Sequence, residues 1–139
     1  MHPNDIRFYM PVFYFGGILA LFLFFKIQSS LDWLAIILTM CGYILWAIGR
    51  INLGQEFYVR PAHPTLLITT GIYRYISHPL YMAQTMVICG LLLYINIWYI
   101  WLILIPYFML QYNRIKKEEG ILLKKFGKRY IEYRKKTWF

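Results

Sequence analysis

The sequence predicts an all-α integral membrane protein with about four transmembrane helices and a further C-terminal helix on the cytoplasmic side. Its 139 residues are 60% hydrophobic and 20% aromatic, and the mean hydropathy is +0.47. A soluble domain of this length is rarely so apolar. Long uncharged runs alternate with short polar segments, which is the pattern of successive membrane spans. We therefore expect residues 1–139 to form a single membrane domain.

Two uncharged runs at the start of the chain predict the first helical hairpin, over residues 8–49. They comprise residues 8–25 and 33–49, and the linker 28–32 between them is short enough to make the two helices antiparallel. A secretory signal peptide begins in a similar way, but no convincing small-residue cleavage site follows. The first run is thus interpreted as a span.

A polar loop and a second hairpin follow. Residues 50–78 contain charged residues, two histidines and two prolines that interrupt regular helix. No Lys, Arg, Asp or Glu then occurs between positions 74 and 114, a length that suits two spans. The spacing predicts a hairpin over residues 79–113 with its turn near 94–96. Pro106 is expected to kink the second arm.

The distribution of basic residues predicts the orientation. With four spans, fourteen of the fifteen Lys and Arg residues fall on one side, and Lys26 alone falls on the other. The positive-inside rule places both termini and the loop 50–78 in the cytoplasm. Residues 114–139 carry ten Lys/Arg against three Glu. This tail, including the basic cluster 134–136, is expected to lie on an anionic membrane surface rather than to bind nucleic acid.

Polar, aromatic and turn-forming residues gather between the two hairpins, over residues 71–81. Gly71 allows the backbone to turn, and Pro79 disfavours a helical conformation at His78 while suiting a first helical turn itself. The chain should bend at Ser77–His78 and enter a helix near Pro79. Its tyrosines are interpreted either as an interfacial aromatic anchor or as part of a polar site.

The tail carries two adjacent acids in a helical pattern. Glu119 shares one helical face with three apolar residues, Ile115, Leu122 and Phe126. A carboxylate in such a stripe needs a partner. Glu118 is spaced to pair with Arg114 one turn away, and the alternative for Glu118 is a solvated surface charge. Gly127 is expected to end this helix, and Tyr130 to begin a short interfacial segment.

The second hairpin predicts a site, because its two ends must meet on one side of the membrane. Tyr73, His78 and Tyr81 would face Arg114 and the two acids Glu118 and Glu119. Such a site offers carboxylates for hydroxyl or ammonium groups and aromatic faces for an onium ion. No metal site is expected, since the two cysteines are scattered within apolar runs and form neither a ligand motif nor a disulfide.

These residues carry a resemblance to a known family. The relevant elements are Gly71-x-Tyr73-Arg74-Tyr75-x-x-His78-Pro79-x-Tyr81, a hydrophobic hairpin, Arg114-x-x-x-Glu118-Glu119, and Phe126-Gly127-x-x-Tyr130-x-x-Tyr133. Their order and spacing resemble the isoprenylcysteine carboxyl methyltransferase family, and the related phospholipid N-methyltransferases share the general pattern. The segment from His63 to Gly71 is also similar. The resemblance covers residues 63–133, which would be the methyltransferase-like core with its cofactor site.

The resemblance implies an integral membrane enzyme that uses S-adenosylmethionine. No Gly-rich loop follows a strand, so a soluble Rossmann-type methyltransferase is excluded. By analogy with the family, the residues that help hold the cofactor are His63, Tyr73, His78, Pro79, Tyr81, Glu118 and Glu119. Arg114 and Glu119 match positions needed for activity. The family's usual Arg before His-Pro is Ser77 here, and Arg74 is the candidate to replace it.

The resemblance is less specific about the acceptor. The favoured acceptor is a lipidic or prenylated molecule, above all the carboxylate of an isoprenylcysteine-like substrate. The alternatives are a phospholipid amine acceptor, an NADPH-dependent membrane reductase, and a non-catalytic membrane adaptor. A carboxylate that attacks a sulfonium methyl needs no general base, whereas an amine must lose a proton. Positioning and desolvation supply most of the acceleration in either case.

Overall fold

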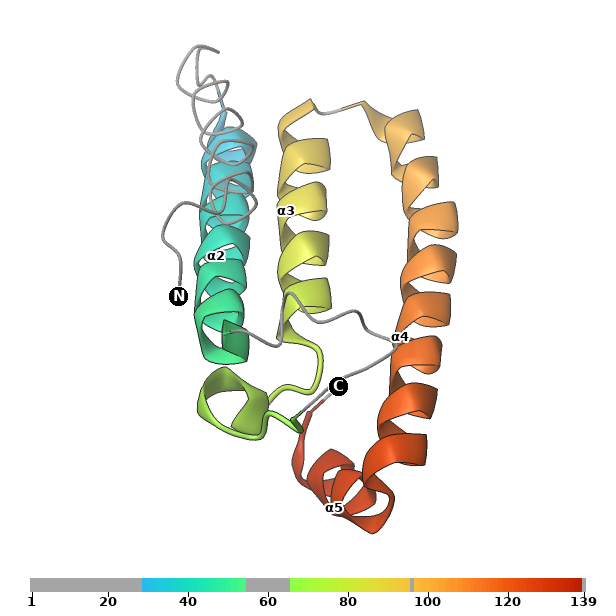
Figure 1. Ribbon diagram of the computed structural model, residues 1–139. Helices are drawn as coiled ribbons and strands as arrows, with labels where there is room; N and C mark the ends of the chain where they lie inside the picture. Colours follow the sequence, from blue (N-terminus) through green and yellow to red (C-terminus); the bar gives the residue numbers. More distant parts are fainter. Residues whose placement is uncertain (1–28, 55–65, 96, 139) are drawn as a thin grey trace, which may run out of the picture.

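The computed structural model describes residues 29–54, 66–95 and 97–138, and its regular elements there are helices apart from one isolated β-bridge (Figure 1). The predicted all-α class is therefore confirmed for this part of the chain. Within these described ranges one helix, α2 (Ser30–Leu53), is long and apolar enough to cross a membrane, and the apolar helix α3 (Pro79–Ile95) is shorter. The count of four spans stays a prediction, and its first member, residues 8–25, lies outside the described residues.

Helix α2 begins with a capping box. The Ser29 backbone N–H donates to Asp32 Oδ2 at 2.8 Å, and the Asp32 N–H donates to Ser29 Oγ at 3.3 Å. These two bonds satisfy donors that the helix itself leaves unpaired. The helix thus starts before the predicted span 33–49 and continues past it to Leu53.

Helices α2 and α3 pack closely because small residues face one another across the seam. A Cβ added to Gly90 would lie 2.8 Å from the carbonyl oxygen of Ala35, and one added to Gly42 would lie 2.9 Å from that of Ala83. Both alanines are fully buried. Small residues are the usual means by which helices in membranes approach each other. This seam anchors the fold.

The predicted fourth span and the predicted tail helix are one continuous helix, α4 (Leu104–Phe126). A 3₁₀ helix, η3 (Trp98–Ile103), precedes it. Pro106 lies in the first turn of α4, where a missing N–H is tolerated, just after the change from 3₁₀ to α-helix, and the kink expected there stays a prediction. Gly127 ends α4 at a φ of +52°, as predicted.

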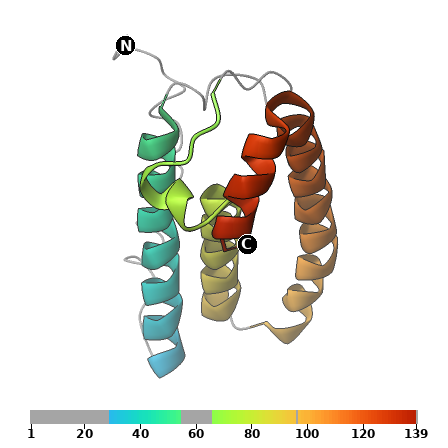
Figure 2. The ribbon, with the colours of Figure 1, turned by 90° about the horizontal axis from the view of Figure 1, so that it is seen from below.

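Helix α5 (Lys128–Lys136) follows Gly127 and turns back beneath the other helices (Figure 1). Figure 2 shows α5 between α4 and the 3₁₀ helix η2 (Gly71–Arg74). The C-terminal end of α2, the start of α3 and the basic end of α4 all lie at this end of the molecule. The predicted meeting of the hairpin ends is therefore observed.

Candidate functional site

The segment before α3 bends where its glycine and proline predict. Gly71 has a φ of +61°, and a Cβ there would collide with the side chain of Asn52 on α2. Pro79 is the first residue of α3, and the Met82 N–H donates to the carbonyl oxygen of His78 at 3.2 Å. The bend therefore places His78 at the N-terminus of α3, where it is only 4% exposed.

The end of the chain clamps this bend. The Tyr133 hydroxyl donates to the carbonyl oxygen of Tyr73 at 2.7 Å, and the Trp138 N–H donates to that of Tyr75 at 2.7 Å. The Ser77 hydroxyl is hydrogen-bonded to that of Thr137. Ser77, the position of the family's usual Arg, is thus occupied in joining the bend to the C-terminal segment.

Glu118 faces α3. The Tyr81 hydroxyl donates to Glu118 Oε2 at 3.1 Å. The predicted ion pair with Arg114 is absent, and no other described residue forms an ion pair with Glu118. Glu118 is therefore a half-buried carboxylate with an aromatic hydroxyl as its partner, rather than a solvated surface charge.

Glu119 has the partner that its place in an apolar stripe predicts. Arg134 Nε donates to Glu119 Oε1 at 3.0 Å, and Lys116 Nζ lies 3.4 Å from Oε2. Burial acts to raise the pKa of Glu119, but the hydrogen bonds from these two cations outweigh it and hold the pKa below its ordinary value. The prediction that Arg134 is surface charge is wrong, because α5 folds back onto α4.

Two buried polar atoms near Glu119 have no hydrogen-bond partner among the described residues: His78 Nε2 and the Tyr130 hydroxyl. His78 Nε2 lies 3.6 Å from Glu119 Oε1, which is too long for a hydrogen bond. Burial lowers the pKa of His78 despite the nearby acids, so the imidazole is neutral at pH 7. Burial also raises the pKa of Tyr130 to about 12, which keeps its hydroxyl protonated.

Tyr73 completes the aromatic part of the site. Its side chain is buried, and burial together with the charge of Glu118 raises its pKa above the ordinary value. Tyr81 meets His78 edge to face, with ring centroids 5.8 Å apart. The structure thus gathers five predicted residues, Tyr73, His78, Tyr81, Glu118 and Glu119. A sixth, Pro79, is buried next to His78 at the start of α3.

Three predicted residues are not gathered in the same way. Arg74 is exposed, and its guanidinium lies 5.9 Å from the ring centroid of Tyr75 rather than at either acid. The turn of η2 directs Arg74 outward, so its proposed replacement of the family's Arg has no support in the geometry. Arg114 is also exposed on α4. His63 lies outside the described residues.

Two cavities flank the site. One of about 600 Å³ lies between α4 and α5 and has a mixed lining; we call it the polar cavity because it contains charged side chains. Its lining residues are Lys116, Glu119, Gly120, Leu123, Tyr130, Ile131, Arg134 and Lys135. An apolar one of about 560 Å³ lies between α3 and α4, and its lining residues are Tyr81, Met82, Thr85, Met86, Phe108, Gln111, Tyr112, Ile115 and Trp138.

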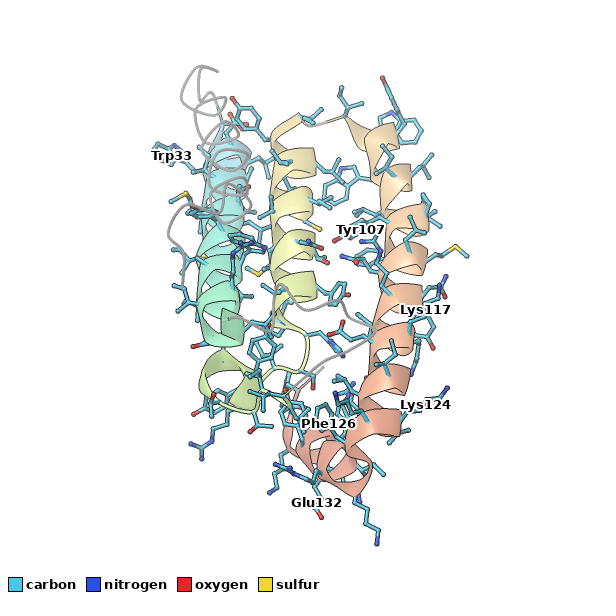
Figure 3. All side chains as sticks on the ribbon, viewed as in Figure 1. Trp33, Tyr107, Lys117, Lys124, Phe126 and Glu132 are labelled. Atoms are coloured by element: carbon cyan, nitrogen blue, oxygen red, sulfur yellow. The ribbon has the colours of Figure 1, made fainter. Side chains whose placement is uncertain are left out.

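A polar cluster between α3 and α4 was not predicted from the sequence. Gln111 Nε2 donates to Gln84 Oε1 at 3.1 Å and to the Tyr107 hydroxyl at 2.7 Å. Figure 3 shows Tyr107 reaching from α4 toward α3, where its hydroxyl lies 3.4 Å from Thr85 Oγ1. The available signal was the presence of two glutamines in an apolar hairpin, since polar residues inside membrane segments usually have a role.

The donor groups suit an organic ligand rather than a metal. No group of three or more His, Cys, Asp or Glu residues in the described part of the chain is placed to hold a metal ion. Two carboxylates, aromatic faces and two unsatisfied polar atoms instead suit a small molecule that carries positive charge and hydrogen-bonding groups.

Comparisons with known proteins agree with this chemistry. The phospholipid methyltransferase family profile matches residues 14–129. The curated protein-S-isoprenylcysteine O-methyltransferase of Dictyostelium discoideum is 26% identical over 130 residues, which cover 78% of this chain and 48% of that protein. The chain thus spans about half the length of this relative. No solved structure matches significantly.

Proposed function

The chain belongs to the phospholipid methyltransferase family, and on this premise we propose that it is a membrane methyltransferase that uses S-adenosylmethionine and a lipidic acceptor. The family match confirms the resemblance seen in the sequence and supports a methyltransferase of a membrane. What we propose beyond the family is the methyl donor, the acceptor and the role of each residue.

One observation carries the proposal: a cavity lined in part by charged side chains and an almost wholly apolar cavity meet the same turn of α4. Ile115 lines the apolar cavity, whereas Lys116, Glu119 and Gly120 line the polar one. Glu118 is on the same turn of α4 but lines neither cavity, and it accepts a hydrogen bond from Tyr81, which lines the apolar cavity. An enzyme that joins a water-soluble donor to a lipid needs two such compartments side by side.

The residues at this junction fit the donor. S-adenosylmethionine supplies, when bound, a methyl group on a positively charged sulfur. Glu118 offers a carboxylate with no cation partner among the described residues, and the rings of Tyr73 and Tyr81 lie close to it. Carboxylates and aromatic faces are the groups that hold onium ions in proteins. These side chains would bind and orient the donor, and the surrounding helices would exclude water.

The apolar cavity fits the hydrocarbon chain of an acceptor, and the favoured acceptor group is the carboxylate of an isoprenylcysteine-like molecule. The Dictyostelium relative, a protein-S-isoprenylcysteine O-methyltransferase, supports this choice. A carboxylate needs no general base. The second candidate, a phospholipid amine, is supported by His78, whose Nε2 makes no hydrogen bond to the described residues and could accept the proton that the amine must lose. Neither a reductase nor an adaptor is favoured by the family match.

The donor assignment is tested by comparing S-adenosylmethionine with S-adenosylhomocysteine, which lacks the sulfonium charge. Calorimetric titration of the purified wild-type protein should show binding of both. Glu118→Gln should weaken S-adenosylmethionine binding about ten-fold or more and S-adenosylhomocysteine binding less, because only the former loses a charge pair. Glu132→Gln, on the exposed face of α5 (Figure 3), is the matched control.

Folded wild-type protein that binds neither compound would refute the proposal. Transfer of labelled methyl groups then identifies the acceptor. Labelling of an S-prenylated N-acetylcysteine supports the carboxylate, and labelling of phosphatidylethanolamine alone supports the amine.

A further inference from the structure

The polar cavity between α4 and α5 holds more hydrogen-bond donors than the described residues use. Its lining includes three cations, Lys116, Arg134 and Lys135, against a single carboxylate, Glu119. Arg134 uses Nε to bind Glu119, and its guanidinium makes no other hydrogen bond to the described residues. An arginine carries five N–H donors. The cavity therefore presents unpaired donors and an excess of positive charge.

Tyr130 lines the same cavity and adds an independent observation. The residue is only 5% exposed, and its hydroxyl has no hydrogen-bond partner among the described residues. Burial raises the pKa of Tyr130 to about 12, so the hydroxyl is a donor at neutral pH. A buried hydroxyl without a partner destabilises the folded protein, and its retention calls for a partner that binds from outside.

The helices bring these donors together. Tyr130 and Arg134 are four residues apart on α5 and therefore lie on the same face, one turn from each other. Lys116 approaches from α4, with its Nζ 3.4 Å from Glu119 Oε2. Donors from α4 and α5 thus surround the Glu119 carboxylate. Some of their N–H and O–H groups stay available to bind a second carboxylate.

We infer that Tyr130, Arg134 and Lys116 form an anion subsite that holds a substrate carboxylate beside Glu119. The inference rests on the proposed function, whose two substrates both supply such a group: the methionyl end of the donor and the cysteine end of the acceptor. A guanidinium that is engaged through Nε still offers its two Nη groups to a carboxylate. The subsite would orient whichever substrate carries that carboxylate.

Tyr130→Phe is the sharpest test because it removes one oxygen that has no hydrogen-bond partner among the described residues. The ligand-free melting temperature should stay the same or rise, since an unsatisfied buried hydroxyl is lost. If the subsite holds the donor's carboxylate, S-adenosylhomocysteine should bind about ten-fold or more weakly. Methylthioadenosine, which lacks the amino-acid end, should bind the variant and the wild type equally. Tyr99→Phe, an exposed tyrosine at the other end of the molecule, is the control.

A pair of adjacent lysines gives a second test. Lys116→Met should weaken binding of the same ligand as Tyr130→Phe, whereas Lys117→Met should have no effect. Lys117 points away from the other helices in Figure 3 and lines neither cavity. Both substitutions remove the same charge from the same helix, so a general electrostatic effect would appear in both.

The outcomes separate the two sources of the carboxylate. If the acceptor supplies the carboxylate, both variants should bind S-adenosylhomocysteine as the wild type does. Their affinity for an S-prenylated N-acetylcysteine should fall about ten-fold, whereas their affinity for the corresponding carboxamide should not change. Two results would overturn the subsite alone. One is that the variants change neither affinity, and the other is that ligand-free Tyr130→Phe melts at a lower temperature than the wild type. If the wild-type protein binds neither S-adenosylhomocysteine nor methylthioadenosine, the proposed function is overturned as well.

Discussion

The two sides of α3 differ in how they meet their neighbouring helices. Toward α2, Gly90 lies so close to Ala35 that no side chain fits between the backbones. Toward α4, Gln84 reaches Gln111 through a hydrogen bond between long side chains, and a cavity of about 560 Å³ opens beside them. One seam is filled by protein atoms and the other leaves room for a ligand. We therefore expect substitutions on the α2-facing side of α3 to affect stability and those on its α4-facing side to affect ligand binding.

We expect the largest effect, a loss of stability, at Gly90, where α3 packs closely against α2. Gly90→Val should destabilise the protein by about 1–3 kcal/mol or more, because its Cβ would lie 2.8 Å from the carbonyl oxygen of Ala35. Gly120→Ala, on α4, is the control, since a Cβ there meets nothing within 4 Å. Thermal unfolding in detergent measures both. Equal melting temperatures for the two variants would contradict the idea that close packing between α2 and α3 stabilises the protein.

Filling the open seam should affect binding instead. Met82 lines the apolar cavity, and Met82→Trp should raise the KM for a lipidic acceptor about ten-fold while S-adenosylhomocysteine binds unchanged. Met109→Trp is the matched control, because Met109 is 64% exposed on α4 and does not line the cavity. Steady-state kinetics and calorimetry separate the two effects. A loss of S-adenosylhomocysteine binding in Met82→Trp alone would show that the apolar cavity holds the donor.

The polar cluster of the open seam should contribute little to stability. Gln111→Leu removes two hydrogen bonds, to Gln84 and to Tyr107, and each is expected to be worth about 0.6 kcal/mol. A double-mutant cycle with Gln84→Leu measures the coupling of the first pair. If Gln111→Leu lost as much stability as Gly90→Val, the contact between α3 and α4 would matter for stability as much as the contact between α2 and α3.

The smallest effect is the pH dependence of stability between pH 6.5 and 5. Burial lowers the pKa of His78 below its ordinary 6.5, so in this window the unfolded chain binds more protons and stability falls as the pH falls. The charged groups that act on His78 are Glu118, Glu119 and Arg134. The pKa of Glu119 is lowered from 4.5, so its own contribution is lost only below this window. His78→Gln should flatten the melting temperature between pH 6.5 and 5, and an unchanged slope would exclude His78 as the cause.

Local chemistry made several features predictable. The bend at residues 71–79 follows from a glycine that adopts positive φ and a proline that begins a helix. The end of α4 follows from Gly127. The need of Glu119 for a partner follows from its place among apolar residues on one helical face. Each of these inferences depends on residues within about one turn of each other.

Other features depend on residues that are distant in the sequence. Ser77 and Thr137 are 60 positions apart, and Gln84 and Gln111 are 27 apart. No spacing rule links such residues, because their contact depends on the angle at which α5 leaves Gly127 and on the separation of α3 and α4. The two cavities arise for the same reason.

The sequence by itself therefore determined the helical class, the family, the bend before α3 and the acids of the site. Only the tertiary structure decided that Arg134 is the partner of Glu119 and that Arg74 is exposed beside Tyr75 rather than paired with either acid. Charge and helical period show that an ion pair is needed, since a carboxylate in an apolar stripe must be compensated. Which cation supplies it is decided by the fold-back of α5, because an ion pair forms only between groups that the backbone brings within a few ångströms.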